Sequence, residues 1–413
     1  MRIRFVNKWA WVYLVVIICL IFTVIPGWIP FVRKEWRLLV LGTIASLFLF
    51  GHFFVSKSAL CLYSYFIILF LNRMSGDIVY HSLPNIIYEV LQYLVPSAVF
   101  FYMFKKTDTV FARTVVVAVL AIICIESVAS FFINENTPNI IRELEALTRA
   151  EGDRGFAYDF MRMGLADYSF CHALPVMIPP LICWIKESKR MKKWILCGVL
   201  FLTCLLIYIS ASGTAILLMV FMIALGLFTS ISNKSNSRRS LIVILIVFAP
   251  FLFSQQLQFA TIDTFISVLP QESYMTQKLE SIRFSLEYEA SEGDVEARAV
   301  RYNKSIDALK ENVLFGSNKR NGGHSAFLDR LGNLGLVGIA PLIIFFIIQF
   351  AITIKYIPER YNLFYIEGMI AALMMFLLKA VSLVPLLILS FIVLPFMLIA
   401  ILDWKQNELT NIQ

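Results

Sequence analysis

Long apolar segments recur along the whole chain and limit its fold more than any other feature of the sequence. A helix needs about 20 mostly apolar residues to cross the hydrocarbon core of a bilayer. Open sheets cannot cross lipid, because the backbone groups at their edges would have no partner, so each span is expected to be a helix. Twelve spans are predicted, at residues 9–25, 36–55, 59–71, 83–104, 110–133, 169–185, 194–210, 213–230, 241–256, 332–354, 362–383 and 385–402.

The composition agrees with a membrane protein. Hydrophobic residues make up 59% of the 413 residues and charged residues 15%, whereas soluble domains average about 45–50% and about 25%. This balance excludes a soluble enzyme, a nucleic-acid-binding module and a disordered protein. The predicted fold class is an all-α, polytopic membrane protein with about twelve transmembrane helices and two long outer loops.

The distribution of Lys and Arg predicts the orientation. With the N-terminus inside, the inner segments carry eighteen Lys and Arg and the short outer loops carry four, namely Arg33, Lys34, Arg37 and Arg73. Because short loops rich in these residues stay on the cytoplasmic side, both termini are expected to be cytoplasmic. No small-residue cleavage site follows the first span, so it is expected to be an uncleaved anchor.

Two long outer loops divide the chain. The predicted parts are five N-terminal spans (1–133), a first outer loop (134–168), spans six to nine (169–256), a second outer loop (257–331), and three C-terminal spans with a tail (332–413). In the first loop, residues 140–150 have an apolar face, which predicts either an amphipathic helix on the membrane surface or a packed loop helix. Long ordered loops often carry function.

Ionisable residues at membrane depth are costly, so they are candidates for function or for buried pairs. His52, Glu126 and Lys379 are three such residues, and Glu126 and Lys379 could pair with each other. His172 begins span six and could line a cavity near the outer face. The seven cysteines lie in or at the edge of apolar runs, which indicates neither a disulfide framework nor a metal site.

The second outer loop holds the candidate chemistry. Arg298, Arg301 and Ser305 share one side of a helix predicted to begin near Val295. A flexible turn at residues 321–323 directly precedes His324. Beyond it the apolar period returns as the chain re-enters the membrane, with glycines that allow close packing.

This pattern resembles the O-antigen ligase and polymerase family of bacterial membrane glycosyltransferases. The matching residues are Arg301, Leu314, Phe315, Gly316, Gly323, His324, Leu328, Leu331, Gly335 and Gly338. Two further stretches, 162–175 and 209–220, match the end of the first outer loop and the turn between spans seven and eight. The chain departs from the family where Gly213 follows Ser212, a place that is commonly Arg, and where Ser325 follows the His, a place that is usually Asn.

The resemblance implies a GT-C-like fold in the bacterial inner membrane and a metal-independent, inverting transfer without a cofactor. The glycan donor and acceptor would be carried on undecaprenyl pyrophosphate, with membrane lipid and a chain-length regulator as further partners and no nucleic acid. Since Arg binds phosphate through two parallel hydrogen bonds, Arg301, Arg298, Arg162 and Arg154 are the expected pyrophosphate contacts. His324 is the expected catalytic base, because its pKa suits proton abstraction near neutral pH.

Three functions remain open at this point. The favoured one is a polymerase of O-antigen or capsular repeat units, since the loop lacks a ligase-type His-Ser-His-Asn run. The second is an O-antigen ligase, which differs in the acceptor. The third is a flippase or transporter of lipid-linked sugar, which is disfavoured because the polar residues gather in the outer loops and not along a central path.

Overall fold

The computed structural model describes residues 55–75, 109–144, 160, 163, 165–231, 255–268, 276–277, 279–280, 283–284, 294–317, 325–379 and 383–401. Helices dominate these residues, and no strand occurs among them. Four predicted spans, 9–25, 36–55, 83–104 and 241–256, lie wholly or almost wholly outside the described residues. The all-α class is therefore confirmed for the described part of the chain, and the total of twelve spans stays a prediction.

The described elements follow the predicted spans closely. In chain order they are α3 (Lys57–Ser75), α5 (Thr109–Asn136), α8 (Tyr168–Ala173), η3 (Leu174–Met177), α9 (Ile178–Glu187), α10 (Arg190–Ile209), α11 (Gly213–Phe228), α13 (Gln255–Val268), α15 (Asp294–Glu311), α16 (Ala326–Tyr356), η4 (Glu359–Tyr361), α17 (Asn362–Leu378), α18 (Leu383–Ile388) and η5 (Leu389–Val393).

Five helical segments of the described chain are long and apolar enough to cross a membrane. They are Ala112–Asn136, Tyr168–Glu187, Arg190–Ile209, Ala326–Tyr356 and Glu359–Leu378. Three shorter apolar helices, Lys57–Asn72, Gly213–Phe228 and Pro385–Ile401, run beside them. The eight predicted spans that reach the described residues thus all coincide with helices.

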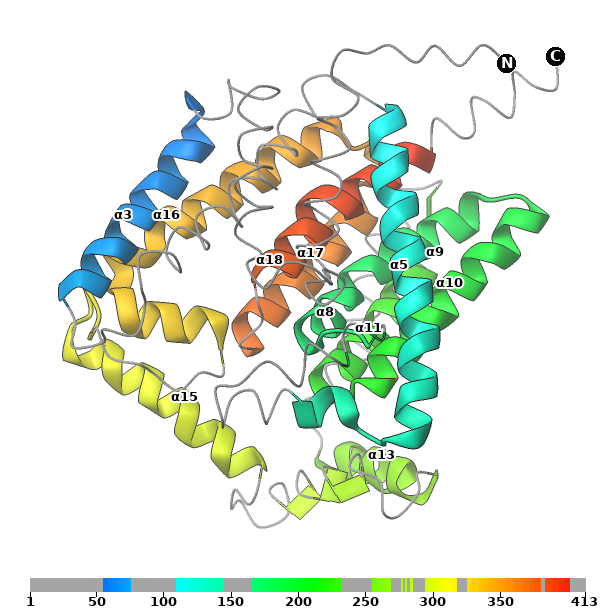
Figure 1. Ribbon diagram of the computed structural model, residues 1–413, viewed down its shortest axis with the longest axis horizontal. Helices are drawn as coiled ribbons and strands as arrows, with labels where there is room; N and C mark the ends of the chain where they lie inside the picture. Colours follow the sequence, from blue (N-terminus) through cyan, green and yellow to red (C-terminus); the bar gives the residue numbers. More distant parts are fainter. Residues whose placement is uncertain are drawn as a thin grey trace.

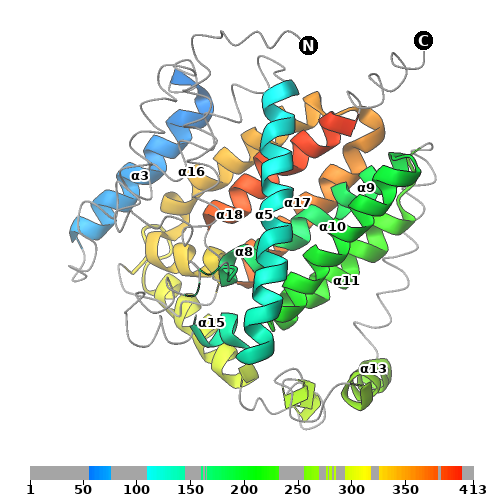
Figure 2. The same ribbon diagram turned by 45° about the vertical axis from the view of Figure 1, so that its right-hand side comes forward.

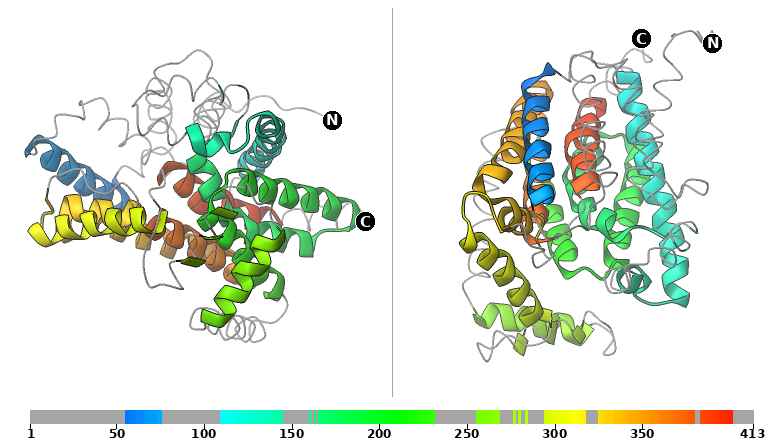
Figure 3. Two further views of the ribbon diagram at one scale, coloured as in Figure 1. Left: turned by 90° about the horizontal axis from the view of Figure 1, so that it is seen from below. Right: turned by 60° about the vertical axis from the view of Figure 1, so that its left-hand side comes forward.

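The helices gather into one bundle whose two ends differ (Figures 1 and 2). Helices α13 and α15 lie below the bundle in Figure 1 and again in the right-hand view of Figure 3. The α9–α10 turn, with Lys186, Lys189 and Arg190, lies toward the other end. The basic turn and the helices of the 257–331 loop therefore lie at opposite ends of the bundle, and which end faces the cytoplasm stays a prediction.

The span from Tyr168 to Glu187 forms the centre of the bundle. Residues 170–183 are all buried, and they pack against α17, α11 and η5. Prolines interrupt the regular helix here, because a proline has no N–H to donate, and the 3₁₀ turn η3 joins α8 to α9 at Pro175.

The stretch after α5 packs into the core. Ile140, Ile141 and Leu144 are buried in the main hydrophobic cluster. Of the two predictions for residues 140–150, the packed loop helix is therefore the one that the described part, up to Leu144, supports.

Helix α16 begins earlier than predicted and is bent. The sequence placed residues 326–331 in the outer loop, but Ser325 caps a helix that starts at Ala326, its Oγ accepting from the Leu328 amide at 3.0 Å. Gly335 then has φ +65°, which divides α16 into a first segment and a membrane-crossing segment. Hydropathy could not find this start, because the first segment carries Asp329 and Arg330.

Two glycines from the resemblance motif explain the bend. The amides of Leu336 and Val337 donate to the carbonyls of Val313 and Leu314, each at 3.0 Å. A Cβ on Gly335 would lie 2.4 Å from the Leu314 carbonyl carbon, and one on Gly316, at φ +76°, would lie 2.2 Å from the Asn333 carbonyl oxygen. Only glycine permits both the positive φ and this backbone approach.

A lysine closes the end of α11. The Lys186 ammonium donates to the carbonyls of Gly226, Leu227 and Thr229 at 2.7–2.8 Å. These are groups at a helix C-terminus that have no partner within the helix, and the positive charge also suits the negative end of the helix dipole. The Thr229 hydroxyl in turn donates to the buried Glu367 carboxyl of α17, so α9, α11 and α17 are joined at this end.

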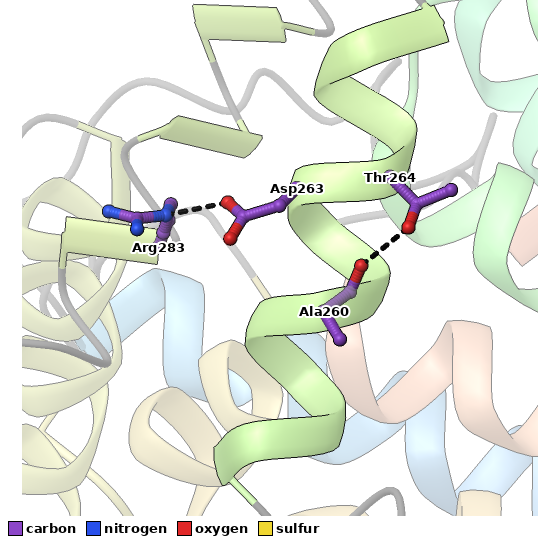
Figure 4. Close-up of polar contacts among 4 residues, drawn as sticks. All are labelled: Ala260, Asp263, Thr264 and Arg283. Carbon is purple, nitrogen blue, oxygen red and sulfur yellow. Dashed lines mark hydrogen bonds and ion pairs between the residues drawn. The ribbon is translucent and has the colours of Figure 1, made fainter.

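Helix α13 is tied to the segment that follows it. Arg283 donates from Nε to Asp263 of α13 at 2.7 Å, and its guanidinium lies over the Phe259 ring, as the close-up in Figure 4 shows for the ion pair. Both charged side chains are about half exposed, so the pair contributes little to stability.

Replacing Gly335 with Ala is expected to destabilise the protein by about 3 kcal/mol, because the new Cβ meets backbone atoms at a positive φ. Gly198→Ala is the matched control, since a Cβ there meets nothing within 4 Å. Thermal unfolding of the purified protein in detergent measures both. Equal melting temperatures for the two variants would contradict the role given to Gly335.

Lys186→Met is expected to lower stability by about 1.5 kcal/mol, since three carbonyls at the end of α11 lose a charged donor. Lys193→Met, at an exposed position of α10, should leave the melting temperature unchanged. If both substitutions lowered it equally, the effect would come from net charge and not from the cap.

Candidate functional site

Three helices meet at the end of the bundle that carries α15, at a place we call the helix junction: residues 301–305 of α15, 325–330 at the start of α16, and 377–379 at the end of α17. The amide of Ala326 donates to the Lys379 carbonyl at 2.8 Å, and the Ser325 hydroxyl donates to the Leu377 carbonyl at 2.6 Å. The start of α16 therefore satisfies the free carbonyls at the end of α17.

Helix α15 completes the junction with two side chains. The Tyr302 hydroxyl donates to the Leu378 carbonyl at 2.8 Å, and the Ser305 hydroxyl donates to Asp329 at 2.6 Å. Arg301 precedes Tyr302 and lies one turn before Ser305, and its side chain is exposed. Arg301 thus lies next to the contacts that join α15 to the start of α16 and the end of α17.

Arg330 is a junction residue that the sequence analysis did not select. Its Nε donates to the Tyr65 hydroxyl of α3 at 3.2 Å, and its Nη1 donates to the Ala326 carbonyl at 3.0 Å. A serine that can cap a helix, Ser325, precedes Arg330 by five residues and could have indicated that Arg330 lies on a helix. The sequence analysis instead assigns this stretch to the outer loop. The contacts hold a guanidinium partly buried at the junction.

The structure describes one of the five predicted site residues in full. Arg301 belongs to the junction, as given above. Arg298 lies on α15, with its side chain outside the described residues. His324, Arg162 and Arg154 also lie outside them, so their roles stay predictions. In the sequence, His324 directly precedes Ser325, the cap of α16.

A second polar site is formed where the other two resemblance stretches meet. The Tyr168 carbonyl can only accept, so His172 Nδ1, 2.8 Å away, carries the proton. Nε2 then accepts from the Ser212 hydroxyl at 2.7 Å. Both side chains are buried. Ser212 thus binds His172 and also caps α11.

The turn before Ser212 is strained. Ala211 has φ +51°, a conformation that residues with a Cβ rarely adopt. The positive φ of Ala211 allows the tight turn from α10 into α11, and in this turn Ser212 faces His172 of α8. Hydropathy carries no signal for this contact, because it depends on how two spans are rotated.

Glu126 of α5 is fully buried beside this second site. Neither of its carboxyl oxygens has a hydrogen-bond partner, and Asp167 is the charged group that acts on it. Asp167 itself caps α8 through the amides of Ser169 and Phe170. The expected pair of Glu126 with Lys379 is therefore not formed, because Lys379 ends α17 at the helix junction. His52 lies outside the described residues.

The comparisons with known proteins give no family. No family model matches the chain, and no curated protein and no solved structure is significantly similar to it.

Ser212→Ala is expected to cost about 1–2 kcal/mol in the wild-type background, because it leaves the buried His172 Nε2 without a donor. In a His172→Phe background the same substitution should cost less, which gives a coupling energy of about 1 kcal/mol in a double-mutant cycle. Thermal or denaturant unfolding measures the four proteins.

Ser210→Ala is the control for this cycle, since the Ser210 hydroxyl bonds locally to the Ile207 carbonyl. It should show no coupling to His172. A coupling as large as that of Ser212 would mean that the cycle reports general loosening of the turn.

Proposed function

We propose that the chain is a membrane glycosyltransferase that polymerises lipid-linked oligosaccharide repeat units, with a twelve-span, GT-C-like fold and its site on the outer face of the inner membrane. One observation carries the proposal: the exposed Arg301 of α15 and the partly buried Arg330 of α16 both belong to the helix junction, which Lys379 of α17 joins through its backbone carbonyl. The same junction contains Ser325, which follows the motif residue His324 in the chain.

The charges of the junction suit a diphosphate. Arginine binds phosphate oxygens through two parallel hydrogen bonds, and fixed cations stabilise the negative charge that gathers on a leaving pyrophosphate. Arg301 is exposed and so accessible to such a ligand. Asp329 is the acidic residue at this place, and the Ser305 hydroxyl donates to it.

The proposed glycosyl transfer needs one general base, which takes the proton from the acceptor hydroxyl. In the proposed transfer, a hydroxyl of the acceptor sugar attacks the anomeric carbon of the donor glycan, and the bond from that carbon to the pyrophosphate oxygen breaks. The hydroxyl proton passes to His324, and the lipid pyrophosphate leaves as the anion. Inversion at the anomeric carbon follows from a single displacement.

The bend in α16 supports a site at the membrane surface. A substrate on a lipid carrier has its phosphates at the level of the headgroups, just outside the hydrocarbon. The first segment of α16 precedes the membrane-crossing segment and holds the junction, which is the level at which such phosphates would lie.

The test uses a deletion strain of the bacterium that carries this gene. It is complemented with wild type, His324→Ala, Arg301→Lys or Lys310→Ala, and the surface glycan is separated on a gel. Wild type and the control Lys310→Ala, an exposed lysine of the same helix that lies outside the helix junction, should restore the ladder. His324→Ala and Arg301→Lys should give single repeat units, since Lys lacks the planar fork of Arg.

Each other result has a distinct meaning, provided that immunoblots show equal protein in the membrane. A full ladder from His324→Ala would remove His324 from the mechanism. Polymer that accumulates on the lipid carrier in the deletion strain would indicate a ligase. Single units retained on the cytoplasmic side would indicate a flippase.

A further inference from the structure

Three consecutive apolar side chains are exposed at the end of the 257–331 loop's main helix. Val313, Leu314 and Phe315 are 48%, 54% and 60% exposed. Their turn is held firmly, because the Phe315 amide donates to Asn312 Oδ1 at 3.1 Å and the carbonyls of Val313 and Leu314 accept from α16. A rigid turn that presents three large apolar groups needs an apolar environment.

This patch continues onto the membrane-crossing segment of α16. Leu336 and Val337, whose amides bond to the turn, are 50% and 43% exposed. Further along the same helix, Ile344 and Ile347 are also exposed. Ile344 follows Val337 by seven residues and Ile347 follows Leu336 by eleven, and both spacings place the side chains on one face of a helix.

The length of the segment fixes the depth of the patch. From residue 336 to residue 356 the helix has 21 residues, which at 1.5 Å per residue is about 31 Å, close to the thickness of the hydrocarbon core. Leu336 then lies at the outer edge of the hydrocarbon. Because the turn is bonded to Leu336 and Val337, it lies at the same level.

We propose that Val313, Leu314, Phe315, Leu336 and Val337 form a lipid anchor that inserts among the acyl chains of the outer leaflet. The occupant is the bilayer itself, since the patch is continuous with the exposed apolar face of a membrane span. The preceding turn of α15 is polar, because Asp307 and Lys310 are exposed and paired with each other, so in this proposal it lies outside the hydrocarbon. The anchor thereby fixes α15 against the membrane surface.

The lipid anchor does not depend on the proposed function, but it would position the candidate site of that function at the membrane surface. A long outer loop could stand away from the membrane, whereas an anchored α15 holds Arg301 at the level of the headgroups. The insertion can be tested without any glycan substrate, so its failure would leave the glycosyltransferase proposal to its own test.

The experiment places the photoreactive analogue benzoylphenylalanine at Phe315, or separately at Leu314, in the full chain. The purified protein is reconstituted in dioleoylphosphatidylcholine vesicles, irradiated and analysed by mass spectrometry. The same group at Asp307, whose side chain is 66% exposed, is the matched control. Phospholipid adducts are expected at 314 and 315, at several times the yield found at 307.

Two results would overturn the proposal. Adducts to protein at 314 and 315, whether a second copy or another part of the chain, would show that a protein surface covers the patch. Equal lipid yields at 315 and 307, or no lipid adduct at either anchor position, would show that the turn has no special contact with acyl chains. Because the analogue is placed at Leu314 and at Phe315 separately, the proposal can still be tested if one of the two variants fails to fold.

Discussion

The close approach of two backbone stretches at Gly316 and Gly335 is the contact on which the helix junction depends. Neither stretch has room for a Cβ where they touch. The contact bends α16, so that its first segment leaves the direction of the membrane span and runs beside α15. Without the bend, Ser325, Asp329 and Arg330 would continue the line of the span and could not meet α15 and the end of α17.

Polar groups buried between the helices add the second constraint. The ends of α11 and α17 are closed by Lys186 and by the start of α16, and α8 is joined to α11 through His172 and Ser212. Buried polar groups are costly when they lack a partner. These bonds therefore specify how the helices are rotated against one another, which apolar packing alone leaves loosely defined. Glu126, Gln349 and Ser390, whose side-chain polar atoms have no hydrogen-bond partner, are among the exceptions in the described part.

Much of the fold was predictable from the sequence, because apolar length and helical period are local signals. They placed α5, α10 and α17 within a few residues, and the glycine spacing indicated the close packing at Gly335. The candidate site was less predictable. Arg330, the Ser212–His172 bond and the separation of Glu126 from Lys379 depend on helix rotation and on the bend, which no local pattern encodes. The first segment of α16 is charged, so a hydropathy scale assigns it to a loop.

The most direct test of the central claim is glycosyl transfer by the purified protein. The protein in vesicles is given an undecaprenyl-pyrophosphate oligosaccharide, without added metal, and the lipid products are analysed by mass spectrometry. A polymerase would give glycans lengthened by whole repeat units together with free undecaprenyl pyrophosphate, and the Arg301→Lys protein would give neither product. An unchanged substrate, or one that crosses the vesicle membrane without chemical change, would contradict the proposed function.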